Sequence, residues 1–185
     1  MAVLLHTPEK RTTINWASGT STEIFVFPAD GNFVERKFTF RISTATVEAE
    51  SSTFTFFEGI TRHLMILKGT LELIHEGRYT KVLQPYDQDV FSGEWNTRSK
   101  GRVTDFNLML KNGATGELVH HTVVKGKQWM RNKTHDYEFV FVAEGQARIA
   151  QNGTANAGDL IQLGTTDFTL EAIENTELVF IQVDV

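Results

Sequence analysis

The residues best suited to chemistry are two arginines, Arg41 and Arg62, and a polar pair, Asp105 and Asn107. A guanidinium presents a planar fork of donors, which can hold a carboxylate through two parallel hydrogen bonds. Arg41 and Ser43 are two residues apart in a segment with strand character, so their side chains share one face of that strand. These residues predict a binding site for a small anion.

Each of these residues also has a purely structural reading. Arg41 can lie in solvent while the alternate Phe40 fills a core, because charged side chains are mostly exposed. Arg62 can be an exposed cation at the beginning of a strand. Asp105 and Asn107 share a strand face, where they either hydrogen-bond a ligand or fix neighbouring groups and pair with an arginine.

Two further side chains complete the candidate site. Glu23 either hydrogen-bonds a ligand or fixes neighbouring groups and pairs with an arginine. Trp16 is either a core or lid aromatic or a platform on which a ligand stacks. The candidate ligand-binding residues are therefore Arg41, Ser43, Arg62, Asp105, Asn107, Trp16 and Glu23.

Several other kinds of site are excluded or disfavoured. The chain has no cysteine, so it has no disulfide, thiolate nucleophile, cysteine zinc site or iron–sulfur cluster. The adjacent His120 and His121 would point to opposite faces of a strand, and the remaining histidines are scattered. No Ser-His-Asp order, phosphate-binding loop, GxGxxG or paired-carboxylate motif occurs. We assign no catalytic residue and expect neither a metal nor a cofactor.

Length and composition indicate a globular protein. The 185 residues suit one compact unit or two small fused ones, and 41% hydrophobic residues with 14 phenylalanines can form a sizeable core. No apolar run approaches the roughly 18 residues that a membrane span needs. The first ten residues show no secretory signal, so we expect a cytoplasmic protein that does not associate with membranes.

The charge distribution argues against nucleic-acid binding. The net charge is −5, and residues 1–112 carry 13 basic and 13 acidic side chains, whereas residues 113–185 carry 5 and 10. An acidic chain without a cluster of lysines and arginines cannot neutralise many phosphates. We therefore expect no nucleic-acid partner.

Short segments with period-two alternation and many β-branched or aromatic residues predict an all-β, antiparallel fold. Turn signals such as Glu76-Gly77 and Asn112-Gly113 separate these segments at hairpin spacing. We expect strands at residues 23–28, 37–47, 64–67, 70–75, 104–110, 137–142, 146–151, 160–163 and 178–183.

A weak internal repeat relates the two halves of the chain. Residues 67–73 and 143–149 each read as strand, glycine, strand, and a polar turn follows both copies, at residues 84–87 and 156–159. Two similar β units predict a duplicated sandwich or barrel, with the join near residues 111–116.

The second copy resembles a cupin, a small jelly-roll barrel. On the spacing of the first cupin motif lie Gly126, Asn132, Thr134, Glu138 and Gly145, and on that of the second lie Gly158, Gly164, Thr166 and Thr169. The resemblance implies a metal bound by imidazoles and one carboxylate, but all the histidine positions are replaced here. In the first copy, Arg62 falls on the carboxylate position. We therefore expect a barrel that has given up its metal.

The first half resembles the HutD/Ves family of the cupin superfamily. The matching blocks are residues 16–24, 40–47, 57–62 and 105–109, in the family's order. The resemblance implies an RmlC-like bicupin and a link to histidine utilisation or stress response, with a small-molecule-sensing role. The chain departs from the family pattern at Glu94 and at Leu110-Lys111, so the ligand of relatives cannot be transferred to it directly.

Taken together, these patterns predict two fused cupin-like barrels or sandwiches, residues 1–112 and 113–185, in one compact protein whose halves can exchange strands. We expect a non-catalytic protein that binds an anionic, amino-acid-derived metabolite in its first barrel. The predicted sheets are compatible with a homodimer. A metal-dependent cupin enzyme acting on a small metabolite is the alternative. A third hypothesis is a regulatory protein whose acidic second barrel docks on a partner.

Overall fold

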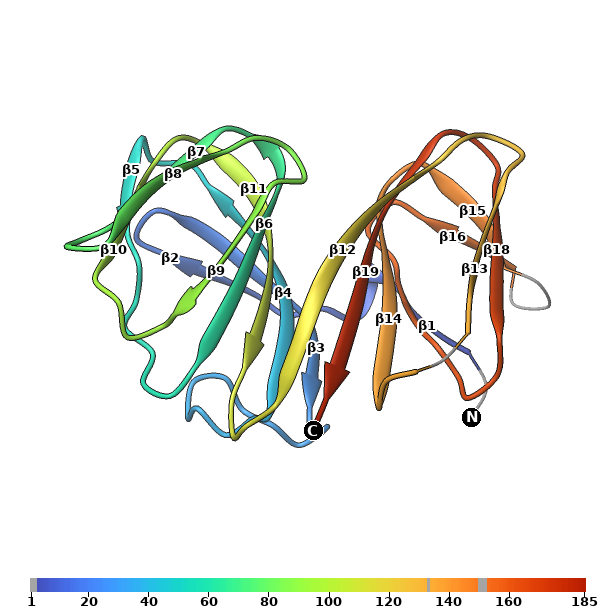
Figure 1. Cartoon of the computed structure of the whole chain (residues 1–185), viewed down its shortest axis with the longest axis horizontal. Coiled ribbons are helices and arrows are strands. Elements are labelled where there is room, and N and C mark those ends of the chain that lie inside the picture. Colours follow the sequence, from blue (N-terminus) through green and yellow to red (C-terminus); the bar gives the residue numbers. More distant parts are fainter. Residues whose placement is uncertain (1–2, 133, 150–152) are drawn as a thin grey trace. The chain divides into compact units, whose positions relative to one another are not determined.

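The computed structural model describes residues 3–132, 134–149 and 153–185, and their regular secondary structure is almost entirely β-strand (Figure 1). The predicted all-β class is confirmed. The one helical element among the described residues is a short 3-10 turn, η1 (Pro8–Lys10). No helix in the described part of the chain has the length and apolar character that crossing a membrane requires.

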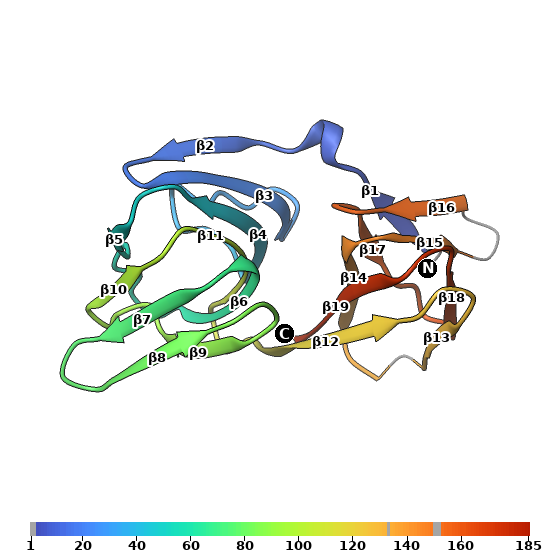
Figure 2. The same cartoon turned by 90° about the horizontal axis from the view of Figure 1, so that it is seen from above.

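The chain divides into two compact units (Figure 2). The first unit comprises residues 11–114, and the second comprises residues 115–185 together with the described residues of the segment before residue 11. The division differs from the expected boundaries, 1–112 and 113–185, chiefly at the start. The reason is that β1 (Leu4–His6) pairs with β17 (Leu160–Gln162) of the second unit.

The first unit consists of two antiparallel sheets. The larger sheet has six strands in the order β2-β3-β4-β11-β6-β9, and the smaller has four in the order β5-β10-β7-β8. The strands of the larger sheet are β2 (Thr13–Trp16), β3 (Gly19–Phe27), β4 (Phe40–Val47), β11 (Val103–Leu110), β6 (Thr61–Gly69) and β9 (Gln88–Ser92). Those of the smaller sheet are β5 (Ser51–Thr53), β10 (Thr97–Lys100), β7 (Leu71–His75) and β8 (Tyr79–Leu83).

The second unit repeats this plan with five strands in the order β1-β17-β14-β19-β12 and four in the order β13-β18-β15-β16. Besides β1 and β17, the first of these sheets contains β14 (Tyr137–Glu144), β19 (Thr176–Asp184) and β12 (Thr115–Val123). The other contains β13 (Gln128–Arg131), β18 (Phe168–Ala172), β15 (Gln146–Ile149) and β16 (Gly153–Asn156).

The two copies of the internal repeat adopt matching backbone conformations. Gly69 is the last residue of β6 and has φ 88°, and Gly145 follows β14 with φ 84°. A side chain would not fit at either position, because a Cβ would lie 2.5 Å from the carbonyl oxygen of Arg102 at Gly69 and 2.4 Å from that of Asn175 at Gly145. Both glycines therefore permit the same turn between strands of two different sheets.

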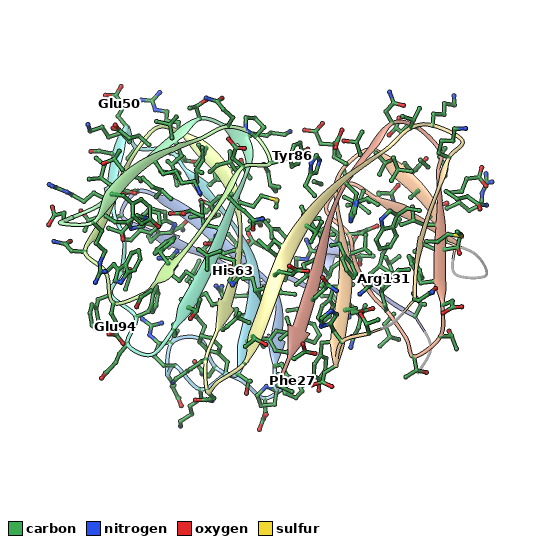
Figure 3. All side chains as sticks on the ribbon, in the orientation of Figure 1. Phe27, Glu50, His63, Tyr86, Glu94 and Arg131 are labelled. Atoms are coloured by element: carbon green, nitrogen blue, oxygen red, sulfur yellow. The ribbon has the colours of Figure 1, made fainter. Side chains whose placement is uncertain are left out.

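The polar turn that follows each copy is also duplicated. In the first unit, the Asp87 carboxylate accepts a hydrogen bond from the Gln84 amide at 2.9 Å. In the second unit, Asp159 accepts one from the Asn156 amide at 2.8 Å. The third residue of each turn is left-handed, with φ 68° at Tyr86, labelled in Figure 3, and 95° at a glycine in the second unit. The repeat seen in the sequence is a repeat of structure.

Strands that were expected from alternation are all present, with shifted ends. The strand expected at 37–47 begins at Phe40, because residue 37 forms an isolated bridge with residue 32. Residues 150 and 151 of the strand expected at 146–151 lie outside the described residues. The strands not expected are mostly short or rich in polar residues, as β8 and β10 are, so their periodicity is weak.

Replacing Gly69 by alanine is expected to destabilise the protein by about 1–3 kcal/mol, because the new methyl group meets backbone and the residue must remain left-handed. Gly77→Ala is the matched control: Gly77 has φ 71°, but a Cβ there meets no atom within 4 Å. Urea unfolding should show the larger loss for G69A. Equal losses would contradict the steric argument.

Candidate functional site

The first unit contains a partly open pocket of about 210 Å³, which we call the cavity. Its wall is formed by side chains on β2, β3, β4, β11 and β6 and by the segments that follow β3 and β5. Arg41, Ser43, Ala45 and Val47 all face it, as period-two geometry requires of one strand face. The volume is below the roughly 300–1,000 Å³ of pockets that take drug-sized ligands, so the cavity suits a small molecule.

Arg41 is 2% exposed and already has partners. Its Nε donates to Glu23 Oε2 at 2.8 Å, and its Nη1 donates to Ser43 Oγ at 2.9 Å. Burial lowers the pKa of Arg41, whereas the neighbouring Glu23 carboxylate opposes that shift. The charge of Arg41 is therefore largely balanced from within the unit.

Arg62 is buried without such a partner. Its side chain lies on β6, and its Nη2 donates a long hydrogen bond of 3.3 Å to Asn107 Oδ1. Its Nε is buried and has no hydrogen-bond partner among the described residues. Burial lowers the pKa of Arg62 to about 10, although Asp105 attracts the charged form. A buried donor without an acceptor is costly, and this one belongs to a residue of the cavity wall.

Asp105 and Asn107 lie on β11 and face the same cavity. Asn107 connects the two charged groups, because its carbonyl accepts from Arg62 and its amide nitrogen donates to Asp105 Oδ1. Asp105 is 3% exposed, and burial raises its pKa to about 7 while Arg62 and the bond from Asn107 oppose that rise. The floor of the cavity thus holds a cation, an amide and a carboxyl group that titrates near neutrality.

Aromatic rings cover the faces of three guanidinium groups. Arg41 lies 4.1 Å from the centroid of Phe33, and Arg36 lies 4.7 Å from Phe33 and 4.3 Å from Phe57. Arg62 lies over Phe54 at 4.7 Å. Stacking of this kind stabilises a desolvated cation and leaves its N–H edges free to donate.

The structure brings the candidate residues together. Trp16, Arg41, Ser43, Arg62, Asp105 and Asn107 all line the cavity. Glu23 lies outside its lining and acts through its ion pair with Arg41. The solvent-exposed readings of Arg41 and Arg62 are wrong, because both guanidinium groups are buried. The pairing with an arginine that the structural reading expected of Asn107 is also present, in its bond to Arg62.

Sequence reasoning missed the loop residues of the site. Phe33 and Arg36 lie in the loop between β3 and β4, and Phe54 and Phe57 lie in the segment after β5. Loops carry no periodicity from which the direction of a side chain could be read. Of these loop residues, Phe57 lies in a segment, residues 57–62, that resembles the HutD/Ves family, and this resemblance was the one signal in the sequence that pointed to it.

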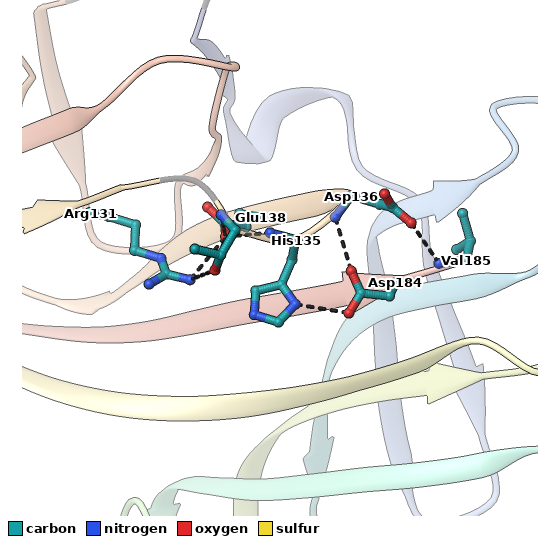
Figure 4. A network of polar contacts seen from close by, with 7 residues as sticks. Arg131, His135, Asp136, Glu138, Asp184 and Val185 are labelled. Atoms are coloured by element: carbon teal, nitrogen blue, oxygen red, sulfur yellow. Dashed lines mark hydrogen bonds and ion pairs between the residues drawn. The ribbon is translucent and has the colours of Figure 1, made fainter.

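The cupin metal positions of the second unit do not fit a divalent ion. Asn132 and Thr134 are exposed, and Glu138 is the one buried carboxylate of the set. Its Oε1 accepts hydrogen bonds from Arg131 Nη2 and from the Thr134 amide, both at 3.0 Å, and from the His135 amide at 3.1 Å (Figure 4). Across the described residues, no group of three or more potential metal ligands occurs.

Strand register shows what corresponds to the arginines in the second unit. In the first unit, Met109 pairs with Arg41 on one side and Arg62 on the other. In the second unit, Gln182 pairs in the same way with Glu117 and Glu138. The two arginines are thus replaced by two glutamates at the equivalent positions.

Arg131 supplies the opposite charge in the second unit. It reaches Glu138 from β13, and Gln182 accepts from Arg131 Nη2 and from His135 Nε2, each at 2.7 Å, when its amide is oriented to satisfy both. The second unit therefore contains a cation from its own chain next to its buried carboxylate.

Comparisons with known proteins give the family and the fold. The HutD family model matches residues 9–180. An uncharacterized 21.2 kDa protein in the hutC 3′ region of Pseudomonas putida is 37% identical over 76 residues, which are 39% of this chain. The chain spans 40% of that relative's length in this match.

Solved structures share the fold over the whole chain. A conserved protein of unknown function from Pseudomonas aeruginosa PAO1 has a TM-score of 0.85 at 22% identity, with 100% of both chains covered. HutD from Pseudomonas fluorescens SBW25 has a TM-score of 0.75 at 19% identity, with 99% and 98% covered. A cupin 2 conserved barrel domain protein from Leptotrichia buccalis has a TM-score of 0.60 at 15% identity, with 94% and 92% covered. The predicted cupin-like fold is confirmed.

Asp105 predicts a pH-dependent stability for the ligand-free protein. Because its pKa in the folded state is raised to about 7, the folded protein keeps a proton that the unfolded chain loses near pH 4. Between these values stability falls with rising pH. The gain in unfolding free energy from Asp105→Asn is therefore expected to grow from pH 4 to about 7, by up to about 1.4 kcal/mol per unit, and then to level off.

Denaturant unfolding at pH 4, 5, 6, 7 and 8 measures this. Ser43→Ala removes another buried polar group of the cavity that does not titrate in this range, so its effect should be the same at every pH. A difference between D105N and the wild type that is flat with pH would contradict the raised pKa.

Arg131 predicts a further stability effect, in the second unit. Arg131→Met leaves Glu138 buried without its cation and is expected to cost about 3 kcal/mol. Adding Glu138→Gln keeps an acceptor for the two backbone amides and should recover most of that loss. The exposed pair Arg148–Glu171 is the control, because Arg148→Met should cost less than about 1 kcal/mol. A double variant as unstable as R131M in urea unfolding would contradict the interpretation.

Proposed function

The chain belongs to the HutD family, and on that premise we propose that it is a non-catalytic protein that binds a small anionic metabolite in the cavity of its first unit. The ligand we propose is a carboxylate derived from an amino acid. Its binding would report the metabolite to a regulatory process, with histidine utilisation as the first candidate and a stress response as the second.

Arg62 carries the proposal. Its guanidinium is 7% exposed, faces the cavity, and keeps a buried Nε without an acceptor among the described residues. Moving a cation out of water costs several kcal/mol unless an opposite charge or hydrogen bonds compensate. A ligand carboxylate would accept from Nε and from one terminal nitrogen, which is the bidentate geometry that guanidinium groups favour.

The second unit supports this assignment by contrast. At the strand position of Arg62 it has Glu138, whose charge is met by Arg131 of the same unit. The fold can therefore place an opposite charge from its own chain against a buried charge at this position, although Glu138 Oε2 and Arg131 Nε have no hydrogen-bond partner among the described residues. In the first unit the hydrogen-bond partner of Arg62 is the neutral Asn107, at 3.3 Å. The positive charge of Arg62 can therefore still attract an anionic ligand into the cavity.

The lining of the cavity favours binding over catalysis. Among the described residues that line it there is one carboxyl group, Asp105, and there is no histidine or lysine. Hydrolysis or group transfer usually needs a separate acid and base or a nucleophile next to a base. Three phenylalanines and a few polar groups are typical of a pocket that selects a ligand by shape and charge.

The descriptions of two relatives support a carboxylate as the class of ligand to test. The Pseudomonas putida relative is described by its place in the hutC 3′ region, and the Pseudomonas fluorescens HutD structure is described for a formate condition. Formate is the smallest carboxylate. These descriptions belong to those proteins, and they support testing carboxylates here.

N-acetylglycine is expected to raise the melting temperature of the wild-type protein, because a ligand that binds only the folded state stabilises it by about 2.7 kcal/mol at 100 times its Kd. N-acetylglycinamide, the uncharged analogue, should give no shift. Arg62→Gln and Arg41→Ala should each abolish the response to N-acetylglycine in differential scanning fluorimetry. Glutarate and N-formylated amino acids extend the same test.

Arg102→Gln is the matched control, because Arg102 is exposed, pairs with Glu50 and lies outside the cavity lining. This variant should respond like the wild type. If no carboxylate in the series shifts the melting temperature of the wild type, the proposed function is wrong. Stoichiometric iron, manganese, zinc or nickel in the purified protein would favour the metal-dependent enzyme instead.

A further inference from the structure

Asp105 is the one carboxyl group among the described residues that line the cavity, and it lies on the same floor as Arg62. It is 3% exposed, and one of its oxygens accepts a hydrogen bond from the Asn107 amide. Asp105 therefore shares with Arg62 the space in which an anionic ligand would have to bind.

The charges around this floor are nearly balanced when Asp105 is ionised. Arg41, on β4, is paired with Glu23 at 2.8 Å. Arg62, on β6, is attracted by Asp105, and its direct hydrogen-bond partner, Asn107, is neutral. Arg36, in the loop after β3, stacks between two phenyl rings farther along the wall. An ionised Asp105 thus neutralises the positive charge of Arg62 with which an anionic ligand would interact.

A ligand carboxylate would add a second negative charge beside the same guanidinium. Two carboxylates that share one buried site do not both remain ionised, because their repulsion is poorly screened there. A carboxylic acid beside a carboxylate, by contrast, donates a hydrogen bond through its O–H and removes the repulsion.

We infer that Asp105 is the acid of this site: it is protonated whenever an anion occupies the cavity, so that each anion is bound together with one proton. This inference rests on the proposed function. In it, Asp105 selects for anions because it loses its own negative charge, by taking up a proton, when an anion binds. The ligand bound is a carboxylate, which accepts from Arg62 and from the O–H of Asp105.

The acidity of Asp105 in the empty cavity agrees with this role. Burial raises its pKa to about 7, against the opposing effects of Arg62 and Asn107. Asp105 is therefore partly ionised near neutral pH before a ligand arrives, and a ligand anion raises the pKa further. Proton uptake should be small at pH 5.5, where the group already carries its proton, and should approach one per anion at pH 8.5.

Isothermal titration with N-acetylglycine tests the inference. The carboxyl group of this probe stays ionised between pH 5.5 and 8.5, so it contributes no proton change of its own. Titrations near pH 7.5 in imidazole and in Tris, two cationic buffers with different ionisation enthalpies, give the number of protons taken up there, and the slope of log Kd against pH gives it at the other pH values. For the wild type, Kd should be constant below about pH 7 and should rise about tenfold per pH unit well above it.

Asp105→Asn is neutral at every pH and keeps an amide N–H in place of the acid O–H. Its Kd should be independent of pH, and its proton uptake should be zero. Glu50→Gln, a carboxylate change at an exposed residue outside the cavity lining, should keep the uptake of the wild type. The circular dichroism and melting curve of each variant establish that it is folded before titration.

Two failures are distinguishable. If the wild type binds N-acetylglycine with pH-independent affinity and no proton uptake, or if D105N still takes up a proton, the inference about Asp105 is overturned and the binding function stands. If the wild type binds neither N-acetylglycine nor the other carboxylates of the series at any pH, the proposed function fails, and the inference fails with it.

Discussion

Arg62 carries a full positive charge in a place that water barely reaches, and the first unit is arranged around that constraint. Several contacts each offset part of the free-energy cost of burying this guanidinium. Phenyl rings cover its faces, and Asn107 accepts one hydrogen bond from it. Asp105 supplies an opposite charge, but burial raises the pKa of Asp105 and so disfavours its ionised form. None of these contacts satisfies the group completely. The cavity is the space in which the remaining interaction can be made.

The duplicated architecture shows that the fold can place an opposite charge in direct contact with a buried charged residue at this position. The glycine turns and the aspartate turns are the same in both units, and so is the register of the strands that flank the central position. The second unit contains a glutamate there, with an arginine from a neighbouring strand against it. One scaffold thus has two electrostatic arrangements at equivalent strand positions.

The extent to which this site could be predicted follows from periodicity. The faces of β4 and β11 are set by alternation, so Arg41 could be grouped with Ser43 and Asp105 with Asn107 before any coordinates were known. Whether that face was inside or outside could not be decided, because Phe40 and Arg41 were equally compatible with either side. The rings of Phe33 and Phe54 come from loops, and the pairing of Glu23 with Arg41 joins different strands, so no local pattern contained them.

The pairing of β1 with β17 has a consequence for the order in which the chain can fold. Residues 4–6 leave the ribosome long before their partners at residues 160–162. Residues 11–114 contain all the strands of the first unit, so that unit can form while synthesis continues. Until residues 160–162 have been made, β1 has no partner strand. The second unit is complete only when β1 pairs with β17 across a connection of more than 150 residues. Its completion is therefore one of the slow, non-local steps of folding.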